Sequence, residues 1–353
     1  MTRTRRLAHH STAATSLALL SDHELGALLA SGTPAGAGVG GRATLVEVDG
    51  VRVFVKRVPL TDVEQLPENV RSTADLGAWR ELAVHAMTTN WVLAGDSSGF
   101  PLMYHCRVLP EPDQQLLPDE LADVEAAVGY WGGSAGVRRR IEALRTASAS
   151  VALFLEYIPH TLHDWLRAQL AAGDAESACR LVEQGLEVIT SFLGSRQLLH
   201  MDAHFGNILT DGRELYLADY GLALSSRFRL TPDERAFFDR HRAYDRDYTS
   251  LYLVLWLVTE LYGHRGEERS AFLRACADGA RPEGVPEAVA EVISRHARTA
   301  AVMDDFSRRF QQRVTVWEPR PPGTAQLPAH VPAGPSADAR SGSVGEDGPP
   351  PPR

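Results

Sequence analysis

The sequence predicts an α+β protein, with an antiparallel sheet and one main helix over about residues 36–158 and an α-rich region over about 159–317. Two apolar patterns indicate the sheet. Residues 45–55 alternate around an Asp-Gly turn, as in a β-hairpin, and residues 151–157 form an apolar run with the length of a buried strand. The apolar run 251–258 is too short to cross a bilayer and indicates the central buried helix of the second region.

Local signals predict the elements at the N-terminal side. Residues 79–87 read as the main helix of the first region, with apolar residues one turn apart. Residues 1–35 are predicted to be an extension in which a basic, disordered start leads into a helix. Ser21 and Glu24 provide a capping box for that helix. A signal peptide is the alternative interpretation of the basic start.

Two further segments stand apart from these regions. An insert of about forty residues, about 110–150, separates two strand candidates, and we expect it to form two short helices joined at Gly132-Gly133. The insert could contact a substrate or a partner, or it could be a purely structural pair of helices, and the sequence leaves both interpretations open. Residues 318–353 are rich in Pro, Gly, Ser and Ala, and they cannot bury enough apolar surface to offset their ordering entropy. We expect a disordered tail there.

Composition limits the classes of function. The chain of 353 residues carries a formal net charge of −9 and a pI of about 5.8, which argues against a nucleic-acid-binding protein. Its three cysteines, Cys106, Cys179 and Cys276, are far apart in the sequence, so neither a disulfide framework nor a Cys-x-x-Cys metal site is expected. We therefore expect a cytoplasmic protein that acts neither on nucleic acid nor in a membrane.

The most informative stretch is residues 200–221. Asp202 precedes Asn207 by five residues, and Asp219 follows 17 residues after Asp202 (219 − 202). Phosphoryl transfer from ATP needs one carboxylate that accepts the proton of the attacking hydroxyl, and oxygen ligands that hold Mg²⁺ against the phosphates. Residues 208–218 read as strand, Asp-Gly turn, strand. Such a hairpin would bring Asn207 and Asp219 together as two ligands of one metal cluster.

A glycine cluster and a lysine lie upstream of this stretch. Gly38, Gly40 and Gly41 have backbone N–H groups that can approach a phosphate without a Cβ in the way. Lys56 lies at the end of the following hairpin, 18 residues past Gly38 (56 − 38). A flexible loop and a solvated strand lysine are the alternatives for the two features taken alone. Their spacing, and their order before Asp202, favour a phosphate site.

A lysine in this role needs a carboxylate that holds it against the phosphates. Glu81, in the helix predicted over residues 79–87, is the expected partner of Lys56. Glu64 and Glu68 compete for the role, but they lie beside a proline in a less regular segment. A solvated helix glutamate is the alternative interpretation of Glu81.

Together these motifs resemble the protein-kinase-like superfamily, with features of bacterial Ser/Thr protein kinases and of aminoglycoside-type phosphotransferases. The resemblance implies a bilobal α+β fold, with an antiparallel N-lobe sheet plus a helix, an α-rich C-lobe, and ATP and Mg²⁺ between the lobes. It implies that Asp202 is the catalytic base, that Lys56 and Glu81 complete the catalytic set, and that Asn207 and Asp219 are the metal ligands.

The same resemblance implies the residues that would hold the nucleotide. Its glycine-rich loop corresponds to Gly38, Gly40 and Gly41. The buried strand candidate near residue 155 would lead into the hinge, where backbone groups of Glu156 and Ile158 would bond adenine.

The sequence departs from a protein kinase on the side of the phosphate acceptor. Met201 stands where many protein kinases carry Arg, and His204 stands where they usually carry Lys, although a histidine is common there in the aminoglycoside-type branch. Thr231 and Glu234 form a capping box, so the next helix begins about ten residues after residues 219–221. A segment this short offers little platform for a peptide. We expect that its phosphorylation is not the activity switch.

The class of acceptor stays open between a protein and a small molecule. The upstream region and hinge favour a divergent Ser/Thr protein-kinase-like enzyme, whereas His204 and the short segment favour a small-molecule, aminoglycoside-type kinase. A third interpretation is a nucleotide-binding pseudokinase that acts as an interaction module. The presence of Lys56, Asp202, Asn207 and Asp219 argues against it.

Overall fold

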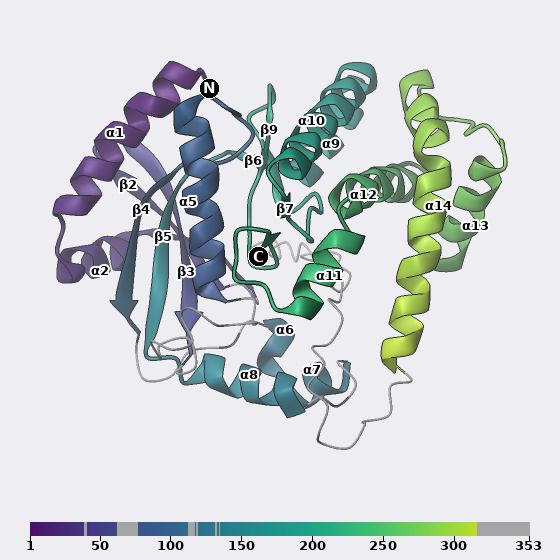
Figure 1. The fold of residues 1–353 in the computed structure, drawn as a ribbon. Coiled ribbons are helices and arrows are strands. Elements are labelled where there is room, and N and C mark those ends of the chain that lie inside the picture. Colours follow the sequence, from purple (N-terminus) through teal and green to yellow (C-terminus); the bar gives the residue numbers. More distant parts are fainter. Residues whose placement is uncertain are drawn as a thin grey trace, which may run out of the picture. The chain divides into compact units, whose positions relative to one another are not determined.

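The computed structural model describes residues 1–38, 41–61, 77–111, 117, 119–130, 133 and 135–315. Within these ranges the chain is a mixed α+β protein with an antiparallel five-stranded sheet and a mostly helical second half (Figure 1). The predicted tail over residues 318–353 lies outside the described residues, as do Gly40, Glu64 and Glu68.

The five-stranded sheet belongs to the first half of the chain. Its strands are β1 (Thr33–Gly38), β2 (Gly41–Val48), β3 (Val51–Leu60), β4 (Met103–Pro110) and β5 (Ala149–Glu156). They follow the order β1-β2-β3-β5-β4, and every neighbouring pair is antiparallel. The predicted hairpin is confirmed as β2 and β3, which join at Asp49 and Gly50. Their φ values of 47° and 75° are those of a turn that favours Asp-Gly. The predicted buried strand is confirmed as β5.

Three helices pack against this sheet: α1 (Arg3–Leu19), α2 (Asp22–Ser31) and α5 (Ala78–Ala94) (Figure 1). The predicted capping box of α2 is confirmed, because Glu24 N–H donates to the Ser21 hydroxyl and Ser21 N–H donates to the Glu24 carboxylate. The expected disorder of the basic start is wrong, since α1 is a helix that buries Arg6, Ala13 and Leu17. These residues lie on one helix face, which the sequence pattern does not reveal because a buried arginine looks like a solvated one.

The insert between β4 and β5 contains three helices in the described residues, where the sequence indicates two. They are α6 (Asp119–Ala122), α7 (Val124–Tyr130) and α8 (Ala135–Arg145). The insert has a small apolar cluster of its own, which contains Leu121, Ala127, Val128 and Ile141. The described helices of the insert therefore share a small core of their own.

The second half of the chain is built from helices and two small antiparallel sheets. Its helices are α9 (Leu162–Ala171), α10 (Ala175–Ser195), α11 (Pro232–Arg240), α12 (Tyr244–Tyr262), α13 (Gly266–Ala277) and α14 (Glu287–Thr315). In one sheet β8 (Ile208–Thr210) pairs with β6 (His160–Thr161) and β9 (Leu215–Leu217), and in the other β7 (Leu198–Leu199) pairs with β10 (Leu224–Ser225). The described residues include no helix with both the length and the apolar character needed to cross a bilayer.

Three predicted features of this half are confirmed. The hairpin expected over residues 208–218 is formed by β8 and β9. The apolar run 251–258 lies inside α12, with most of its side chains buried. The capping box of Thr231 and Glu234 begins α11.

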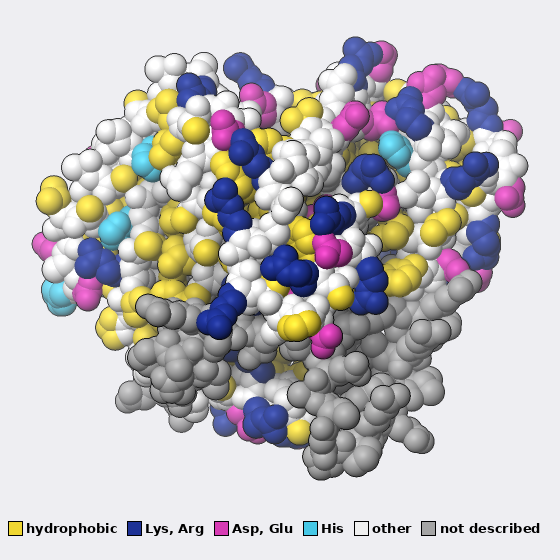
Figure 2. Space-filling model, in the orientation of Figure 1, with side chains coloured by type: hydrophobic (Ala, Val, Ile, Leu, Met, Phe, Trp, Pro, Cys, Tyr) yellow, Lys and Arg dark blue, Asp and Glu magenta, His cyan; other side chains and the backbone are white. Residues whose placement is uncertain are grey.

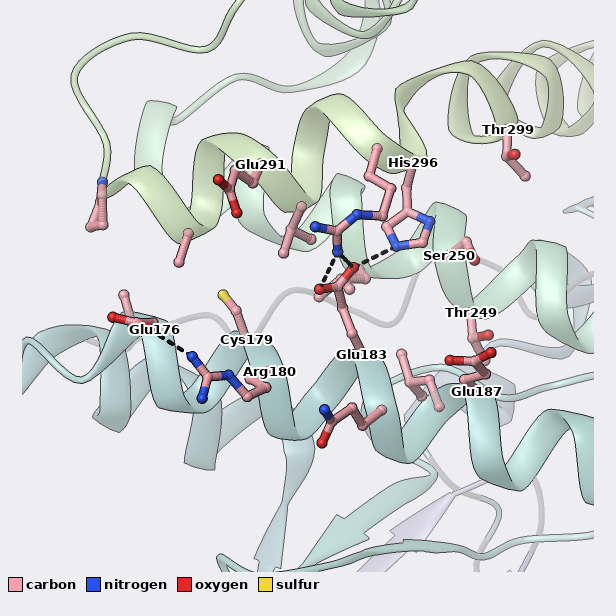
Figure 3. A pocket seen from close by; sticks show the side chains of 18 of the residues that line it. Glu176, Cys179, Arg180, Glu183, Glu187, Thr249, Ser250, Glu291, His296 and Thr299 are labelled. Atoms are coloured by element: carbon pink, nitrogen blue, oxygen red, sulfur yellow. Dashed lines mark hydrogen bonds and ion pairs between the residues drawn. The ribbon is translucent and has the colours of Figure 1, made fainter.

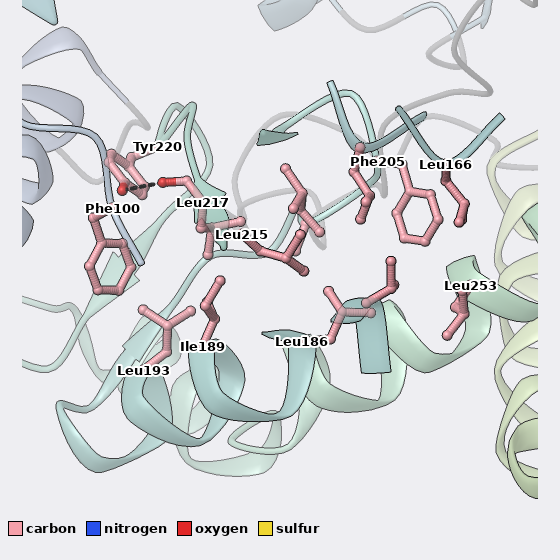
Figure 4. Packing of buried hydrophobic residues seen from close by; sticks show 14 of the residues in the cluster. Phe100, Leu166, Leu186, Ile189, Leu193, Phe205, Leu215, Leu217, Tyr220 and Leu253 are labelled. Atoms are coloured by element: carbon pink, nitrogen blue, oxygen red, sulfur yellow. Dashed lines mark hydrogen bonds between the residues drawn. The ribbon is translucent and has the colours of Figure 1, made fainter. Parts of the chain in front are cut away.

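The β8–β9 hairpin rests on α10. Leu186, Ile189 and Leu193 of α10 share one apolar cluster with Leu215 and Leu217 of β9 (Figure 4). A glycine in α10 permits this close packing, because a Cβ on Gly185 would lie 2.7 Å from the Leu215 side chain. The hairpin is thus packed closely against α10. This packing also fixes the positions of the loop before β8 and the loop after β9.

We predict that Gly185→Ala destabilises the protein by about 1–3 kcal/mol, because the added methyl group overpacks the contact with Leu215. Gly194 lies in the same helix, where an added methyl group would meet nothing within 4 Å, so Gly194→Ala should instead stabilise the protein by up to about 1 kcal/mol. Urea unfolding of both variants measures the difference. A shift of both variants in the same direction would contradict the packing described.

Candidate active site

The candidate site is organised around the side chain of Lys56, which lies on β3. Its Nζ is 2.7 Å from Glu81 Oε1 on α5 and 2.7 Å from Asp219 Oδ1, just after β9. Lys56 and Glu81 are 8% and 2% exposed, whereas the Asp219 side chain keeps 40% of its surface exposed. The structure therefore brings together three of the predicted site residues, and it pairs Lys56 with the expected glutamate.

One ammonium group faces two carboxylates in this triad. Burial lowers the pKa of Lys56, but the attraction of Asp219 and Glu81 outweighs burial and raises it above its ordinary value. Burial raises the pKa of Glu81 to about 7, against the attraction of Lys56. Burial acts in the same direction on Asp219, but Lys56 is stronger there and lowers its pKa to about 2. The more accessible carboxylate of the pair is thus the one that stays ionised.

Lys56 is the only lysine in the sequence, in which lysines and arginines together number 36. Arginine fills all the other positions of this kind, and it can also bridge two carboxylates, as Arg308 does with Glu267 and Asp304, but with a different geometry. A guanidinium is a flat fork that binds one carboxylate with two parallel bonds, whereas an ammonium is a compact point charge. The single lysine is a signal that the sequence offers without any structural knowledge, and it supports a chemical requirement at this position.

The second part of the site is the loop before β8, which carries Asp202 and Asn207. Asn207 Nδ2 donates to the Asp202 carbonyl at 3.0 Å and to Asp202 Oδ2 at 3.1 Å. Burial, with repulsion from Asp219, raises the pKa of Asp202 to about 7. Asp202 Oδ1 is buried and accepts no hydrogen bond within the described residues. The asparagine therefore orients one carboxylate oxygen and leaves the other one free.

His200 joins this loop to the residue before Asp219. Its Nδ1 accepts the backbone N–H of Asp202 at 3.2 Å, so the ring proton is on Nε2, which donates to the carbonyl of Ala218 at 3.0 Å. Burial lowers the pKa of His200 to about 4, which keeps the ring neutral. These two bonds give His200 a structural role in the loop.

Asp245, on α12, anchors the loop that carries Asp202, and no sequence motif indicates this role. Its two carboxylate oxygens accept the backbone N–H groups of His200 at 2.7 Å and Met201 at 2.8 Å. Met201 has a φ of 69° and Asp219 has a φ of 61°, both in the left-handed region that non-glycine residues rarely adopt. Strained backbone at both positions needs firm support from its surroundings. A carboxylate 44 residues away supplies it to Met201, and sequence spacing gives no sign of that.

A second residue that the sequence motifs miss is Arg80, the neighbour of Glu81 on α5. Its Nη1 lies 2.8 Å from Glu234 Oε1, and both side chains are at most 10% exposed. The other oxygen of Glu234 accepts the N–H of Thr231 at 2.8 Å. One carboxylate thus caps α11 and holds α5, the helix that presents Glu81 to Lys56.

The predicted glycine loop is only partly described. Gly38 pairs with Gly41 across β1 and β2, and Gly40 lies outside the described residues. Gly41 has a φ of 123°, and a Cβ there would lie 2.1 Å from the carbonyl oxygen of Arg57. Close packing of β2 on β3 therefore already requires this glycine, whether or not a phosphate approaches it.

The two predicted hinge residues differ in their backbone bonds. Glu156 N–H donates to the Leu102 carbonyl at 2.7 Å, and the Glu156 side chain turns toward Arg6 on α1. The N–H of Glu156 therefore already donates to the residue before β4 and is not available to adenine. Ile158 is buried, and its backbone makes no hydrogen bond to the other described residues.

The donor set suits a magnesium ion that shares its ligands with phosphate and water. The amide nitrogen of Asn207 donates to Asp202, so its amide oxygen is available to a metal ion. Asp219 has an ionised and accessible carboxylate. Mg²⁺ prefers such hard oxygen ligands and is usually held by one or two carboxylates together with substrate phosphates. Among the described residues, no group of three or more His, Cys, Asp or Glu side chains could hold a metal alone. This finding is compatible with a shared site of that kind.

A pocket of about 1090 Å³ lies elsewhere, between α10, α12 and α14 (Figure 3). Glu183 points across it and binds Arg295 and His296 on α14. Neither Lys56 nor Asp202 lines this pocket. Its central carboxylate is already paired, so the pocket adds no reactive group to the site.

No known family model matches the sequence, and a search of curated proteins finds no relative.

We predict that Asp245→Asn destabilises the protein by about 1–3 kcal/mol, because an amide offers only one oxygen to two buried N–H donors. Asp247, two residues along α12, pairs only with its neighbour Arg246 in the described part of the chain and provides a matched control. Asp247→Asn should change stability by no more than about 0.5 kcal/mol. Urea unfolding compares the two variants, and equal losses would refute the anchoring role of Asp245.

Proposed function

We propose that this protein is an ATP-dependent phosphotransferase that moves the γ-phosphate of Mg·ATP to a hydroxyl group. The observation that carries the proposal is the triad of Lys56, Glu81 and Asp219, with Asp202 and Asn207 on the adjoining loop. These five residues come from four segments of the chain, and a set of this kind performs phosphoryl transfer by positioning and charge stabilisation. A bilobal kinase-like arrangement, with ATP between a sheet lobe and a helical lobe, is part of the same proposal.

Each residue has a distinct task in the proposed reaction. The acceptor oxygen forms a bond to the γ-phosphorus while the bond from that phosphorus to the leaving oxygen of ADP breaks. Asp202 takes the proton of the acceptor hydroxyl on its carboxylate, which Asn207 orients and whose side chain is 16% exposed. Lys56 stabilises negative charge on the phosphates, and Glu81 holds Lys56 in place. Asn207 and Asp219 would hold Mg²⁺, which supplies further positive charge beside the phosphates when bound.

The first candidate for the acceptor is a protein, as in a divergent Ser/Thr protein-kinase-like enzyme. Four exposed arginines lie in the segment after Asp219 or on α11: Arg227, Arg229, Arg235 and Arg240. None of them has a carboxylate partner within the described part of the chain. Figure 2 shows basic side chains gathered over α11. In a chain with a net charge of −9, this local basic surface favours an acidic segment of a partner protein.

A second candidate, a small-molecule kinase, is favoured by a different observation. Tyr244, Tyr248 and Tyr252 lie at i, i+4 and i+8 on α12 and form one stripe. The ring of Tyr252 is 6.0 Å from His204, whose Nε2 is 3.8 Å from Asp202 Oδ2. Burial, together with the charges of Asp245 and Asp202, raises the pKa of both Tyr244 and Tyr248. An aromatic wall beside the base fits a compact ring that carries the hydroxyl.

We predict that Asp219→Ala abolishes Mg·ATP turnover and weakens Mg-dependent ATP binding, because it removes a metal ligand and a partner of Lys56. Asp202→Ala should lower turnover by about 10²–10⁴-fold and leave ATP affinity nearly unchanged. Asp278→Ala, at an exposed position after α13, serves as the control. Turnover is measured as ADP release and affinity by calorimetry. Undiminished turnover in Asp219→Ala would sink the site assignment.

Enzyme and pseudokinase are separated by comparing two measurements on the wild type. Mg-dependent thermal stabilisation by ATP reports nucleotide binding, and phosphate transfer reports catalysis. We predict both. Binding without any transfer would favour the interaction module.

The acceptor classes are separated by incubating the protein and γ-labelled ATP with a cell extract, with Asp202→Ala as the blank. Label in macromolecules supports the protein acceptor. Label confined to small metabolites, together with its loss in Tyr252→Ala, supports the small-molecule acceptor. If the label distribution equals that of the blank, neither acceptor proposal holds.

A further inference from the structure

Arg6, in the first turns of α1, is a buried cation whose three guanidinium nitrogens all donate hydrogen bonds. Its Nε and Nη2 donate to the two carboxylate oxygens of Glu156 at 2.8 and 2.7 Å. Nη1 donates to the Ser98 carbonyl at 2.8 Å, and Nη2 also donates to the Phe100 carbonyl at 2.6 Å. The side chains of Arg6 and Glu156 are 2% and 1% exposed. Such a bidentate, desolvated pair fixes geometry as well as charge.

The partners of Arg6 belong to segments that serve different parts of the candidate site. Glu156 is the last residue of β5, directly before the predicted hinge. Ser98 and Phe100 lie in the loop between α5 and β4. The ring of Tyr216 on β9 lies 5.0 Å below the Arg6 guanidinium. One side chain therefore contacts the strand that leads to the adenine side, the loop beyond α5, and the hairpin whose ends carry Asn207 and Asp219.

Hydrogen bonds among these partners extend the junction. Glu156 Oε2 also accepts the N–H of Leu102 at 3.0 Å, and the carbonyl of Gly99 accepts the N–H of Leu217 at 2.9 Å. The loop that receives Arg6 thus bonds directly to β9 and to the end of β5. Removing Arg6 would leave Glu156 buried without its counter-charge, which is far more disruptive than losing an exposed ion pair.

We propose that Arg6 is a positioning residue, which fixes β5 and the β8–β9 hairpin relative to each other and so sets the affinity for nucleotide. The part that concerns nucleotide rests on the proposed phosphotransferase function. The part that concerns the junction does not. Helix α1 therefore helps to position the site. Ala13 and Leu17, on the same face as Arg6, hold the helix on the sheet, and Arg6 contacts Tyr216 of the β8–β9 hairpin.

The test uses the full chain and compares Arg6→Met with Arg5→Met. Arg5 is the adjacent residue, is exposed, and its side chain donates only to His9 within the described part of the chain. Hydrogen exchange without nucleotide is measured at Leu102, Glu156 and Leu217, with Val46 and Val48 of β2, a strand that does not pair with β5, as internal reference. We expect Arg6→Met to accelerate exchange at the three junction amides at least about tenfold more than at the reference amides. Arg5→Met should accelerate neither.

A double variant separates positioning from stability. Arg6→Met with Glu156→Met replaces the buried ion pair by apolar side chains, which commonly preserves stability. It cannot restore the bonds to the Ser98 and Phe100 carbonyls. We expect a smaller loss of urea stability than in Arg6→Met, because no charge is left buried alone, although the Leu102 N–H and two carbonyls lose a partner. ATP affinity, measured by calorimetry with Mg·ATP, should be at least about tenfold weaker. Wild-type affinity and exchange in the double variant would overturn the proposal, as would a uniform increase in exchange in Arg6→Met.

The two levels of the proposal fail in different ways. If wild-type protein does not bind Mg·ATP, the proposed function falls, and the exchange data still support or overturn the junction by themselves. If wild type binds Mg·ATP and the double variant binds it equally well, the function stands and Arg6 is only a structural residue.

Discussion

The contact of Lys56 with Glu81 and Asp219 is the interaction on which the candidate site depends. It joins β3, α5 and the end of the β8–β9 hairpin at one ammonium group, with both N–O distances at 2.7 Å. Two carboxylates would repel each other without that charge, and the buried one would be too costly to keep. Because Glu81 is shielded and Asp219 is open, the triad leaves one ionised carboxylate facing outward. This asymmetry is the feature on which the proposed metal and phosphate site rests.

The surrounding structure meets this constraint through other buried charges that bond distant segments. Arg80 and Glu234 hold α5 against α11, and Asp245 holds the loop of Asp202. Arg6 joins α1 to the end of β5 and to the loop before β4. The two ion pairs make further bonds to the backbone and Asp245 accepts two backbone N–H groups, which offsets part of the desolvation cost of these charges. Apolar packing of α10 against β9 then fixes the position of the β8–β9 hairpin on the helices. Buried charges thus determine which segments bind each other, and apolar packing determines how closely they approach.

Much of this arrangement could be predicted from local sequence chemistry. Asp-Gly turns placed both hairpins, capping boxes placed the starts of α2 and α11, and the spacing of Asp202, Asn207 and Asp219 indicated that these three residues lie near one another. Prediction failed where a residue's role depends on a distant partner. The basic start of α1 resembles a disordered segment, because Arg6 is buried only through its ion pair with Glu156, 150 residues away. Asp245 and Arg80 have no local pattern either, and the solitary lysine is a compositional signal that no motif contains.

Because the chain has a single lysine, its ammonium group can be observed alone. Protein produced with lysine labelled with ¹⁵N at Nζ should give one side-chain ammonium resonance. We predict a slowly exchanging, hydrogen-bonded ammonium that stays protonated above the ordinary lysine pKa and whose resonance shifts when Mg·ATP is added. The resonance should move toward that of a free lysine in Glu81→Gln. A fast-exchanging ammonium with an ordinary pKa, indifferent to Mg·ATP, would contradict the central role given to Lys56.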